Sequence, residues 1–239
     1  LSPPARAVPD TDWHVEKLYA FASAMGASVL KANFSRYVVD LNRPTDGARL
    51  YPGQRETGLC PLITFRDEPL YAPGDEPGTA EIAARVEAYW KPYHDKLAAT
   101  LAALKARHGF AVLWDAHSIR AEVPVLFEGR LPDFNLGTGG GTACPAEIAE
   151  ALLAVAARAE GFTAVLDGRF KGGYITRHYG RPEEGIIAVQ LELSQSAYMD
   201  ENQPALWDAD RAEPARAVIE QLLRAVIDGA RRFAGGGTA

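Results

Sequence analysis

The chain has 239 residues, of which 47% are hydrophobic and 23% charged, and its formal net charge is −6. This length suits one α/β domain or two small ones, and the composition argues against disorder, collagen or a coiled coil. An acidic balance without a Lys/Arg-rich segment argues against nucleic acid as the partner, and no run approaches the roughly 18 apolar residues of a membrane helix. Residues 1–10 show no signal peptide, and Cys60 and Cys144 are too few for a disulfide framework or a Cys-based zinc site. We therefore expect a cytoplasmic protein.

The first third of the chain predicts little regular structure. Caps at Asp10 and Thr11 and an apolar stripe predict a helix that ends at Gly26. Two short β-like segments follow at 27–30 and 37–41. Residues 42–78 are dense in Gly and Pro, and so long a stretch without periodicity is typical of a functional loop region.

The rest of the chain alternates helices and strands. A long helix is predicted over 79–108, with a kink at Pro92. After it we expect strands at 110–114, 163–166, 174–176 and 187–193, and helices at 145–160 and 214–233. Such alternation predicts an α/β fold with a mixed, largely parallel central sheet and helices on both faces. We find no internal repeat or linker, so residues 1–239 are predicted to form a single domain.

The most informative local pattern is Asp115-Ala116-His117 at the end of the apolar segment 110–114. Alternate residues of a strand face the same side, so Asp115 and His117 are predicted to point together. The carboxyl ends of strands are where α/β sheets place ligand sites, and there His117 could bind a metal with a carboxylate to orient it. Local hydrogen bonding within a loop is the alternative for both residues.

Asp12 and His14 form a second candidate pair near the predicted helix start. A carboxylate and an imidazole are both zinc ligands. Acidic residues at a helix N-terminus also act as caps and complement the helix dipole, which is the simpler reading for at least one of Asp10 and Asp12.

Glu192 interrupts the apolar segment 186–193. An unpaired buried charge is costly, so this carboxylate is predicted to be paired, protonated or at a strand mouth, where it could serve as a general base. The alternative is a strand with alternating faces that places Gln190, Glu192 and Ser194 toward solvent.

Two groups of cationic residues could bind an acidic substrate. Arg36, Asn42 and Arg43 gather at the segment 37–41, and guanidinium forks match carboxylate oxygens, although ion pairs with nearby acids would also account for them. The second group surrounds Gly172-Gly173 and comprises Arg169, Lys171, Arg177 and His178. The Gly-rich run 137–142 lacks the Lys-Ser/Thr of a phosphate loop and is instead expected to be a mobile flap.

Several segments, taken in order, resemble the N-formylglutamate amidohydrolase family. They are Pro9–Val15, Ser35–Pro44, Leu50–Gln54, Thr57–Pro61, Trp114–Arg120, Leu131–Thr138, Gly168–Arg177 and Gln190–Leu193. The resemblance spans about Pro9 to Tyr198. It implies a zinc-carboxypeptidase/phosphorylase-hydrolase-like fold and the zinc-dependent hydrolysis of N-formyl-L-glutamate to formate and L-glutamate, the last step of one histidine-degradation route.

The resemblance also implies roles for individual residues. His117 and Asp12 would hold one Zn²⁺ per chain, with His14 as a further candidate, and Glu192 would be the catalytic glutamate. Arg36 resembles the arginine that polarises the scissile carbonyl. Asn42 and Arg43 resemble the pair that binds the substrate carboxylate, with Arg169, Arg177 and His178 as further substrate contacts.

The start of the chain departs from the family pattern. Family members usually begin with a strand that ends in Pro-His-Ala/Ser-Gly, whose His resembles the first zinc ligand, whereas residues 1–9 contain no His. We expect either a fragment that starts just after that motif or a protein that has lost a ligand. Two other functions therefore stay open: hydrolysis of another N-acyl amino acid, as in aspartoacylases, and metal-free, non-catalytic binding of an acidic ligand. On every reading the expected partner is a small acidic molecule, with no membrane partner.

Overall fold

The computed structural model describes residues 1–236. Contacts between residues divide the chain into two compact units. The sequence predicted a single domain. The first unit comprises Leu1–Thr11, Lys31–Ala99 and Glu122–Gly129. The second comprises Asp12–Leu30, Thr100–Ala121 and the chain from Arg130 onward. Each unit is described by itself.

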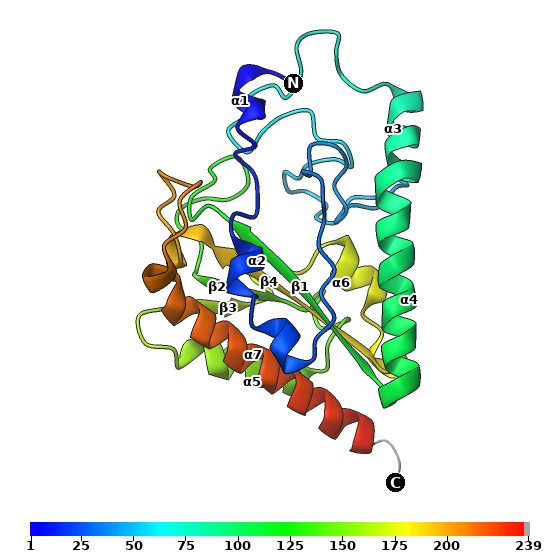
Figure 1. Ribbon diagram of the computed structural model, residues 1–239, viewed down its shortest axis with the longest axis vertical. Coiled ribbons are helices and arrows are strands. Elements are labelled where there is room, and N and C mark those ends of the chain that lie inside the picture. Colours follow the sequence, from blue (N-terminus) through cyan, green and yellow to red (C-terminus); the bar gives the residue numbers. More distant parts are fainter. Residues whose placement is uncertain (237–239) are drawn as a thin grey trace. The chain divides into compact units, whose positions relative to one another are not determined.

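The second unit is built on a four-stranded sheet, with the strand order β1-β4-β2-β3 (Figure 1). The two parallel pairs are β1 with β4 and β2 with β3, and the central pair β4 with β2 is antiparallel. The strands are β1 Ala111–Ile119, β2 Phe134–Gly137, β3 Ala164–Leu166 and β4 Ile186–Ser194. This arrangement confirms the predicted mixed, largely parallel α/β sheet.

The two faces of the sheet differ because side chains alternate along each strand. On β4 the residues Ile187, Val189, Leu191 and Leu193 belong to the main apolar core, whereas Gln190 and Glu192 lie on the other face. Every residue of β4 is buried. The face of β4 that carries Gln190 and Glu192 is therefore polar although it is buried. Polar side chains are unusual on the buried face of a central strand.

Helices cover both faces of this sheet. The helices α5 (Ala146–Ala157) and α7 (Ala209–Gly236) pack against each other and on the apolar face (Figure 1). The short helix α6 (Tyr174–Tyr179) contacts β4 and β1 on the polar face. The helices predicted at 145–160 and 214–233 are confirmed, with α7 beginning five residues earlier so that Pro214 lies within it.

The first unit contains little regular structure. It holds α1 (Pro3–Arg6), α3 (Thr79–Arg85), a π-helical turn over Val86–Trp90 and the first half of α4 (Lys91–His108). The irregularity predicted at Pro92 appears as this π-turn, one turn earlier. Proline lacks an N–H donor, so the carbonyl four residues before it loses its usual helical partner. A small core of Ala5, Tyr37, Leu70 and Tyr71 holds the unit together.

Three predictions of local structure were wrong. The segments 27–30 and 37–41 form no strands. The segment 174–176 is the start of α6, because three residues are too few to distinguish a helical from a strand period and the helix continues through Tyr179. The strand β2 was not predicted.

The predicted helix over 10–26 is broken into α2 (Val15–Leu18) and a 3-10 turn over Ala22–Met25. Asp10 is not its cap. The Asp10 carboxylate instead accepts hydrogen bonds from the Tyr37 hydroxyl at 2.7 Å and the Phe65 backbone N–H at 2.8 Å. His14 precedes α2 in a left-handed conformation with φ 59°.

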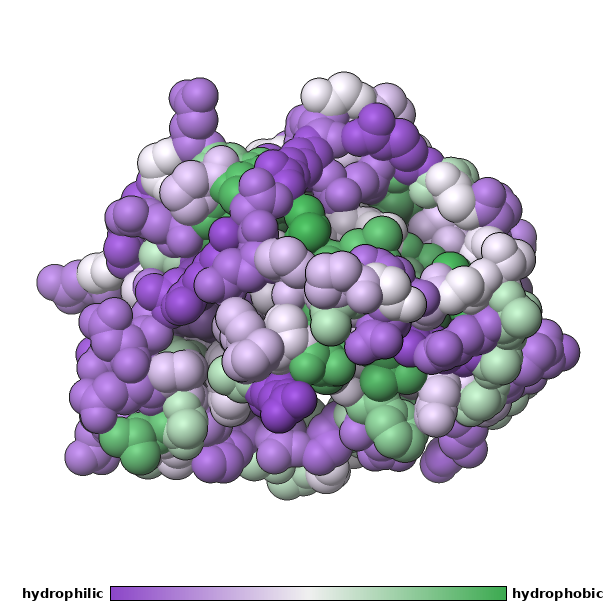
Figure 2. Space-filling view, turned by 90° about the horizontal axis from the view of Figure 1, so that it is seen from above, coloured by the Kyte–Doolittle hydropathy of each residue, from purple (hydrophilic) through white to green (hydrophobic). Residues whose placement is uncertain are grey.

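Hydrophilic residues cover most of the face shown in Figure 2, with hydrophobic residues gathered in smaller areas between them. Within residues 1–236, no helix combines the length and apolar character needed to cross a bilayer.

Candidate active site

The imidazole of His117 lies between two carboxylates. Its Nε2 is 2.9 Å from Oδ1 of Asp115, and its Nδ1 is 3.5 Å from Oδ2 of Asp12. The strand β1 places Asp115 and His117 on one face, as their spacing predicted. Asp12 comes from the segment before α2 and is fixed by its Oδ1, which accepts the backbone N–H of Ser118 at 2.8 Å.

The protonation of His117 depends on these carboxylates. Burial disfavours the imidazolium, but Asp115 and Asp12 outweigh it and raise the pKa of His117 well above its ordinary value. A metal ion at Nδ1 would therefore have to displace a strongly held proton.

The pair formed by Asp12 and His117 fits two corners of a zinc site. Ligands about 2.1 Å from a tetrahedral zinc lie roughly 3.4 Å apart, close to the 3.5 Å between Asp12 Oδ2 and His117 Nδ1. Asp115 bonds the opposite ring nitrogen, which is how carboxylates orient metal-binding histidines. Among residues 1–236, no cluster of three or more His, Cys, Asp or Glu suited to a metal is present.

Glu192 is the register partner of His117 across the parallel strands β1 and β4. Paired residues of adjacent strands face the same side about 4.8 Å apart, so the glutamate lies next to the imidazole on the polar face. Its side chain is buried at 8% exposure, which rules out the alternative of a solvent-facing strand. The candidate base and the candidate metal pair are thus brought together.

Gln190 is a site residue that we did not single out from the sequence. Its Nε2 donates to Oε2 of Glu192 at 3.3 Å, and its Oε1 accepts the N–H of Gly173 at 2.7 Å. The second bond fixes which end of the amide faces the glutamate. The signal was present in the sequence as a second polar residue two positions before Glu192 on an apolar strand.

The Gly172-Gly173 turn connects this network to a cation. Arg177 Nε donates to the Gly172 carbonyl at 2.8 Å. Gly137, at the end of β2, makes room for the turn, because a Cβ there would lie 2.5 Å from the Gly172 nitrogen. On the other side, the buried Thr176 hydroxyl donates to Asp115 at 3.3 Å. The turn and α6 therefore hold both Gln190 and Asp115.

The other predicted residues of the second unit lie in different surroundings. His14 Nε2 is 2.8 Å from the Pro204 carbonyl, and its ring packs against Trp207, so the structure does not join it to the metal pair. His178 stacks on Tyr174, and burial, with the nearby charge of Arg181, lowers its pKa. The Arg169 guanidinium lies over the Phe170 ring.

Arg36, Asn42 and Arg43 all belong to the first unit, where they surround Asp40. Arg36 pairs with Asp40 at 2.5 Å, and the Asn42 N–H donates to Asp40 at 2.9 Å. Burial would raise the pKa of Asp40, but Arg36 and Arg43 outweigh it and lower that pKa. Arg43 also donates through Nε to the Thr57 carbonyl at 2.8 Å. The ion pair between Arg36 and a nearby acid, which the sequence offered as an alternative to substrate binding, is therefore present.

Asn135 is a buried polar residue with spare hydrogen-bonding capacity. It is the register partner of Glu192 on β2, and its Nδ2 donates to the Pro132 and Glu192 carbonyls. Its Oδ1 has no hydrogen-bond partner among the described residues. A buried acceptor left open in this way is suited to an N–H donor from a bound molecule.

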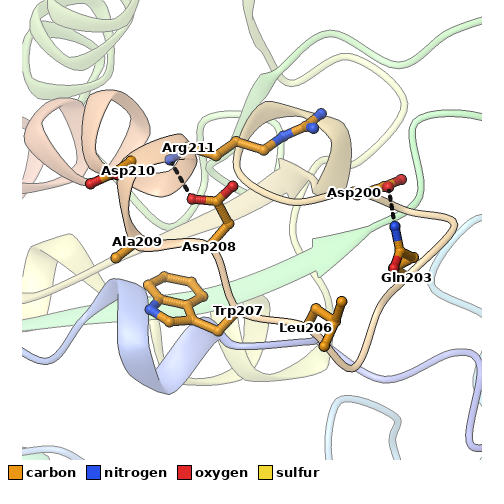
Figure 3. Close-up of a pocket in the computed structure, with 8 residues that line it drawn as sticks. All are labelled: Asp200, Gln203, Leu206, Trp207, Asp208, Ala209, Asp210 and Arg211. Atoms are coloured by element: carbon orange, nitrogen blue, oxygen red, sulfur yellow. Dashed lines mark hydrogen bonds between the residues drawn. The ribbon is translucent and has the colours of Figure 1, made fainter.

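A separate hollow of about 550 Å³ is lined by the segment that follows β4 and by the first turn of α7 (Figure 3). Asp200, Trp207, Asp208 and Arg211 are among its lining residues, and none of the predicted site residues lines it. Asp208 accepts the Arg211 backbone N–H at 3.1 Å and so caps α7, while Asp200 accepts from Gln203 (Figure 3). These acids stabilise the start of a helix and a turn.

A profile of the family described as N-formylglutamate amidohydrolase matches residues 1–199. This match covers the first unit, the four-stranded sheet of the second unit and most of the chain. The chain belongs to the N-formylglutamate amidohydrolase family. The family assignment made from the sequence motifs is thereby confirmed.

Relatives with assigned names support the same family. The chain is 54% identical over 231 residues to the N-formylglutamate deformylase of Pseudomonas aeruginosa and 51% identical over 230 residues to that of Pseudomonas putida. Each alignment covers 96% of this chain and 86% of the relative.

Two solved structures share the fold. The N-formylglutamate amidohydrolase from Ralstonia eutropha JMP134 matches with a TM-score of 0.80 at 24% identity, covering 97% of this chain and 88% of that one. A second protein, from Agrobacterium tumefaciens, matches with a TM-score of 0.64 at 20% identity, covering 91% of this chain and 78% of that one.

Proposed function

We propose that this protein hydrolyses N-formyl-L-glutamate to formate and L-glutamate with the help of a bound zinc ion. The observation that carries the proposal is the placement of Glu192 beside an imidazole that faces Asp12 on one side and Asp115 on the other. The names of the two Pseudomonas relatives supply the substrate. A place at the end of a histidine-degradation route and a cytoplasmic location remain predictions of the sequence.

Asp12 Oδ2 and His117 Nδ1 are the atoms that would hold the zinc ion. When bound, zinc lowers the pKa of its water to about 7 and polarises a carbonyl oxygen. Asp115, bonded to Nε2, would leave the other ring nitrogen free to bind the ion. Thr176 holds Asp115 in turn.

Glu192 performs the proton transfers in this proposal. Its carboxylate accepts the proton of the attacking water and then delivers it to the nitrogen of the departing glutamate, so a single group serves as base and acid. Gln190 holds one oxygen of the carboxylate in place through its Nε2. Burial on the polar face of the sheet keeps bulk water from competing for the proton.

The cationic residues are proposed to bind the two carboxylates of the substrate. In the second unit this role falls to Arg177, with Arg169 and His178 as further contacts. Asn42, Arg43 and Arg36 belong to the first unit, and the substrate roles that the resemblance implies for them remain predictions of the sequence. The ion pair with Asp40 holds the Arg36 guanidinium in place.

The test measures formate release from N-formyl-L-glutamate, with N-acetyl- and N-succinyl-L-glutamate as competing substrates, before and after treatment with a zinc chelator. We expect the formyl substrate to be hydrolysed faster than the acetyl and succinyl substrates. Formate release should stop on chelation and return when Zn²⁺ is added. Preference for a larger acyl group would favour an aspartoacylase-like amidohydrolase. Binding of glutamate without hydrolysis and without metal would favour a non-catalytic role.

A further inference from the structure

The hydroxyl of Tyr198 contacts the residues that directly follow both proposed metal ligands. It is 2.6 Å from the carbonyl oxygen of Trp13, the residue after Asp12, and 2.8 Å from Oγ of Ser118, the residue after His117. These two segments lie far apart in the sequence. One hydroxyl group therefore joins the two backbone positions that carry the ligand pair.

The direction of these bonds follows from their protons. A tyrosine hydroxyl has one proton and also accepts, whereas a carbonyl oxygen only accepts. Tyr198 therefore donates to Trp13, and the Ser118 hydroxyl donates its own proton to the Tyr198 oxygen. The Ser118 oxygen in turn accepts from Gln195 Nε2 at 3.4 Å. In this series of hydrogen bonds the Tyr198 and Ser118 hydroxyls each donate one bond and accept one, which fixes their geometry.

The ring of Tyr198 provides a rigid support for this hydroxyl. Tyr198 has 0% exposure and belongs to the main apolar core, together with Leu18 just beyond Asp12. Ser118 is 4% exposed. Its backbone N–H is the group that holds Asp12 at 2.8 Å. A shift of Ser118 would move both the strand position beside His117 and the donor that orients Asp12.

We propose that Tyr198 is a positioning residue for the metal site: its hydroxyl sets the separation of Asp12 and His117 by joining Trp13 to Ser118. The inference rests on the metal pair of the proposed function. Tyr198 touches neither ligand side chain, so it acts through the backbone on either side of the pair. It has no part in the proton transfers assigned to Glu192.

The variant Tyr198→Phe tests this role because it keeps the buried ring and removes the hydroxyl. Zinc affinity is measured by competition with a chelator of known affinity, and the visible spectrum of the Co²⁺-loaded protein reports the ligand geometry. Changes in the support of metal ligands typically cost 10–100-fold in affinity. We expect a loss of zinc affinity in that range and a changed Co²⁺ spectrum.

Tyr71→Phe is the matched control. The Tyr71 hydroxyl also makes two hydrogen bonds, donating to the Tyr37 carbonyl at 3.2 Å and accepting from Arg85 at 3.0 Å, and it belongs to the first unit. Both variants are expected to lower the unfolding temperature, but only Tyr198→Phe should weaken zinc binding. Should Tyr198→Phe not fold, Ser118→Ala removes the same bridge and leaves the backbone N–H to Asp12.

The outcomes separate this inference from the proposed function. Equal zinc affinity in Tyr198→Phe and the unchanged protein, with an unchanged Co²⁺ spectrum, would overturn the inference alone. Zinc binding that depends on Tyr198 in a protein that does not hydrolyse N-formyl-L-glutamate would support the inference and refute the proposed activity. An unchanged protein that binds no zinc would refute both.

Discussion

His117 and Glu192 stand opposite each other on the adjacent parallel strands β1 and β4, both on the polar face of the sheet. A cationic or metal-binding imidazole and a carboxylate are thereby held side by side by backbone hydrogen bonds. Secondary structure, unlike a flexible loop, fixes such a spacing before any ligand arrives.

Replacing Glu192 with Gln should lower kcat for N-formyl-L-glutamate by about 10²–10⁴-fold, the usual contribution of a general base. Glutamine has nearly the same shape, so zinc content and KM should change little. Steady-state kinetics and elemental analysis of the purified variant check both points. A kcat equal to that of the unchanged protein would show that the proton is taken by another group.

The metal-free protein should lose stability as the pH rises above neutrality. The pKa of His117 is raised in the folded state by Asp115 and Asp12, so folding retains a proton that the unfolded chain loses above about pH 6.5. Between that pH and the raised pKa, the free energy of unfolding should fall by up to about 1.4 kcal/mol per pH unit. Urea titrations at several pH values measure this slope.

Asp115→Asn should weaken the pH dependence of stability, because it removes the carboxylate that raises the pKa of His117 more than Asp12 does. The His117 pKa, followed by NMR of the ring protons, should fall in the variant. Zinc affinity should also drop, by about 10–100-fold, as the ring loses its orienting carboxylate. An unchanged pKa of His117 would contradict the assignment.

Arg36→Gln should destabilise the protein at pH 7 by about 3 kcal/mol, because it leaves the buried Asp40 carboxylate without its ion-pair partner. The pKa of Asp40 is lowered in the folded state, so the pair stabilises the protein above about pH 4 and loses its effect as the pH falls through the lowered pKa. The difference between variant and unchanged protein should therefore shrink in acid. Denaturant titrations at pH 7 and pH 3 compare the two.

Gly137→Ala should cost about 1–3 kcal/mol of stability and weaken turnover. The added methyl would meet the Gly172 backbone at 2.5 Å and displace the turn whose Gly173 N–H holds Gln190. Gly58→Ala is the control, since a methyl there meets nothing within 4 Å. Equal unfolding temperatures and equal kcat for both variants would show that the turn yields without consequence.

Much of the sheet could be predicted because its signals are local. The apolar run at β4 and the two-residue spacing of Asp115 and His117 are each read within a few residues. The helix α6 was predicted as a strand because three residues, Tyr174 to Thr176, are too few to fix a period, and the strand β2 was not predicted. The helix expected after Asp10 broke up because Asp10 bonds Tyr37 and Phe65 instead of the helix N-terminus.

By itself the sequence determined the α/β class, the family and the pairing of Asp115 with His117 on one face, since periodicity and motifs are properties of neighbouring residues. Only the tertiary structure placed Asp12 within 3.5 Å of His117, turned His14 toward Pro204 and brought the Tyr198 hydroxyl to Trp13 and Ser118. Such contacts join segments up to 190 residues apart. They depend on how the core packs, and no local pattern records that.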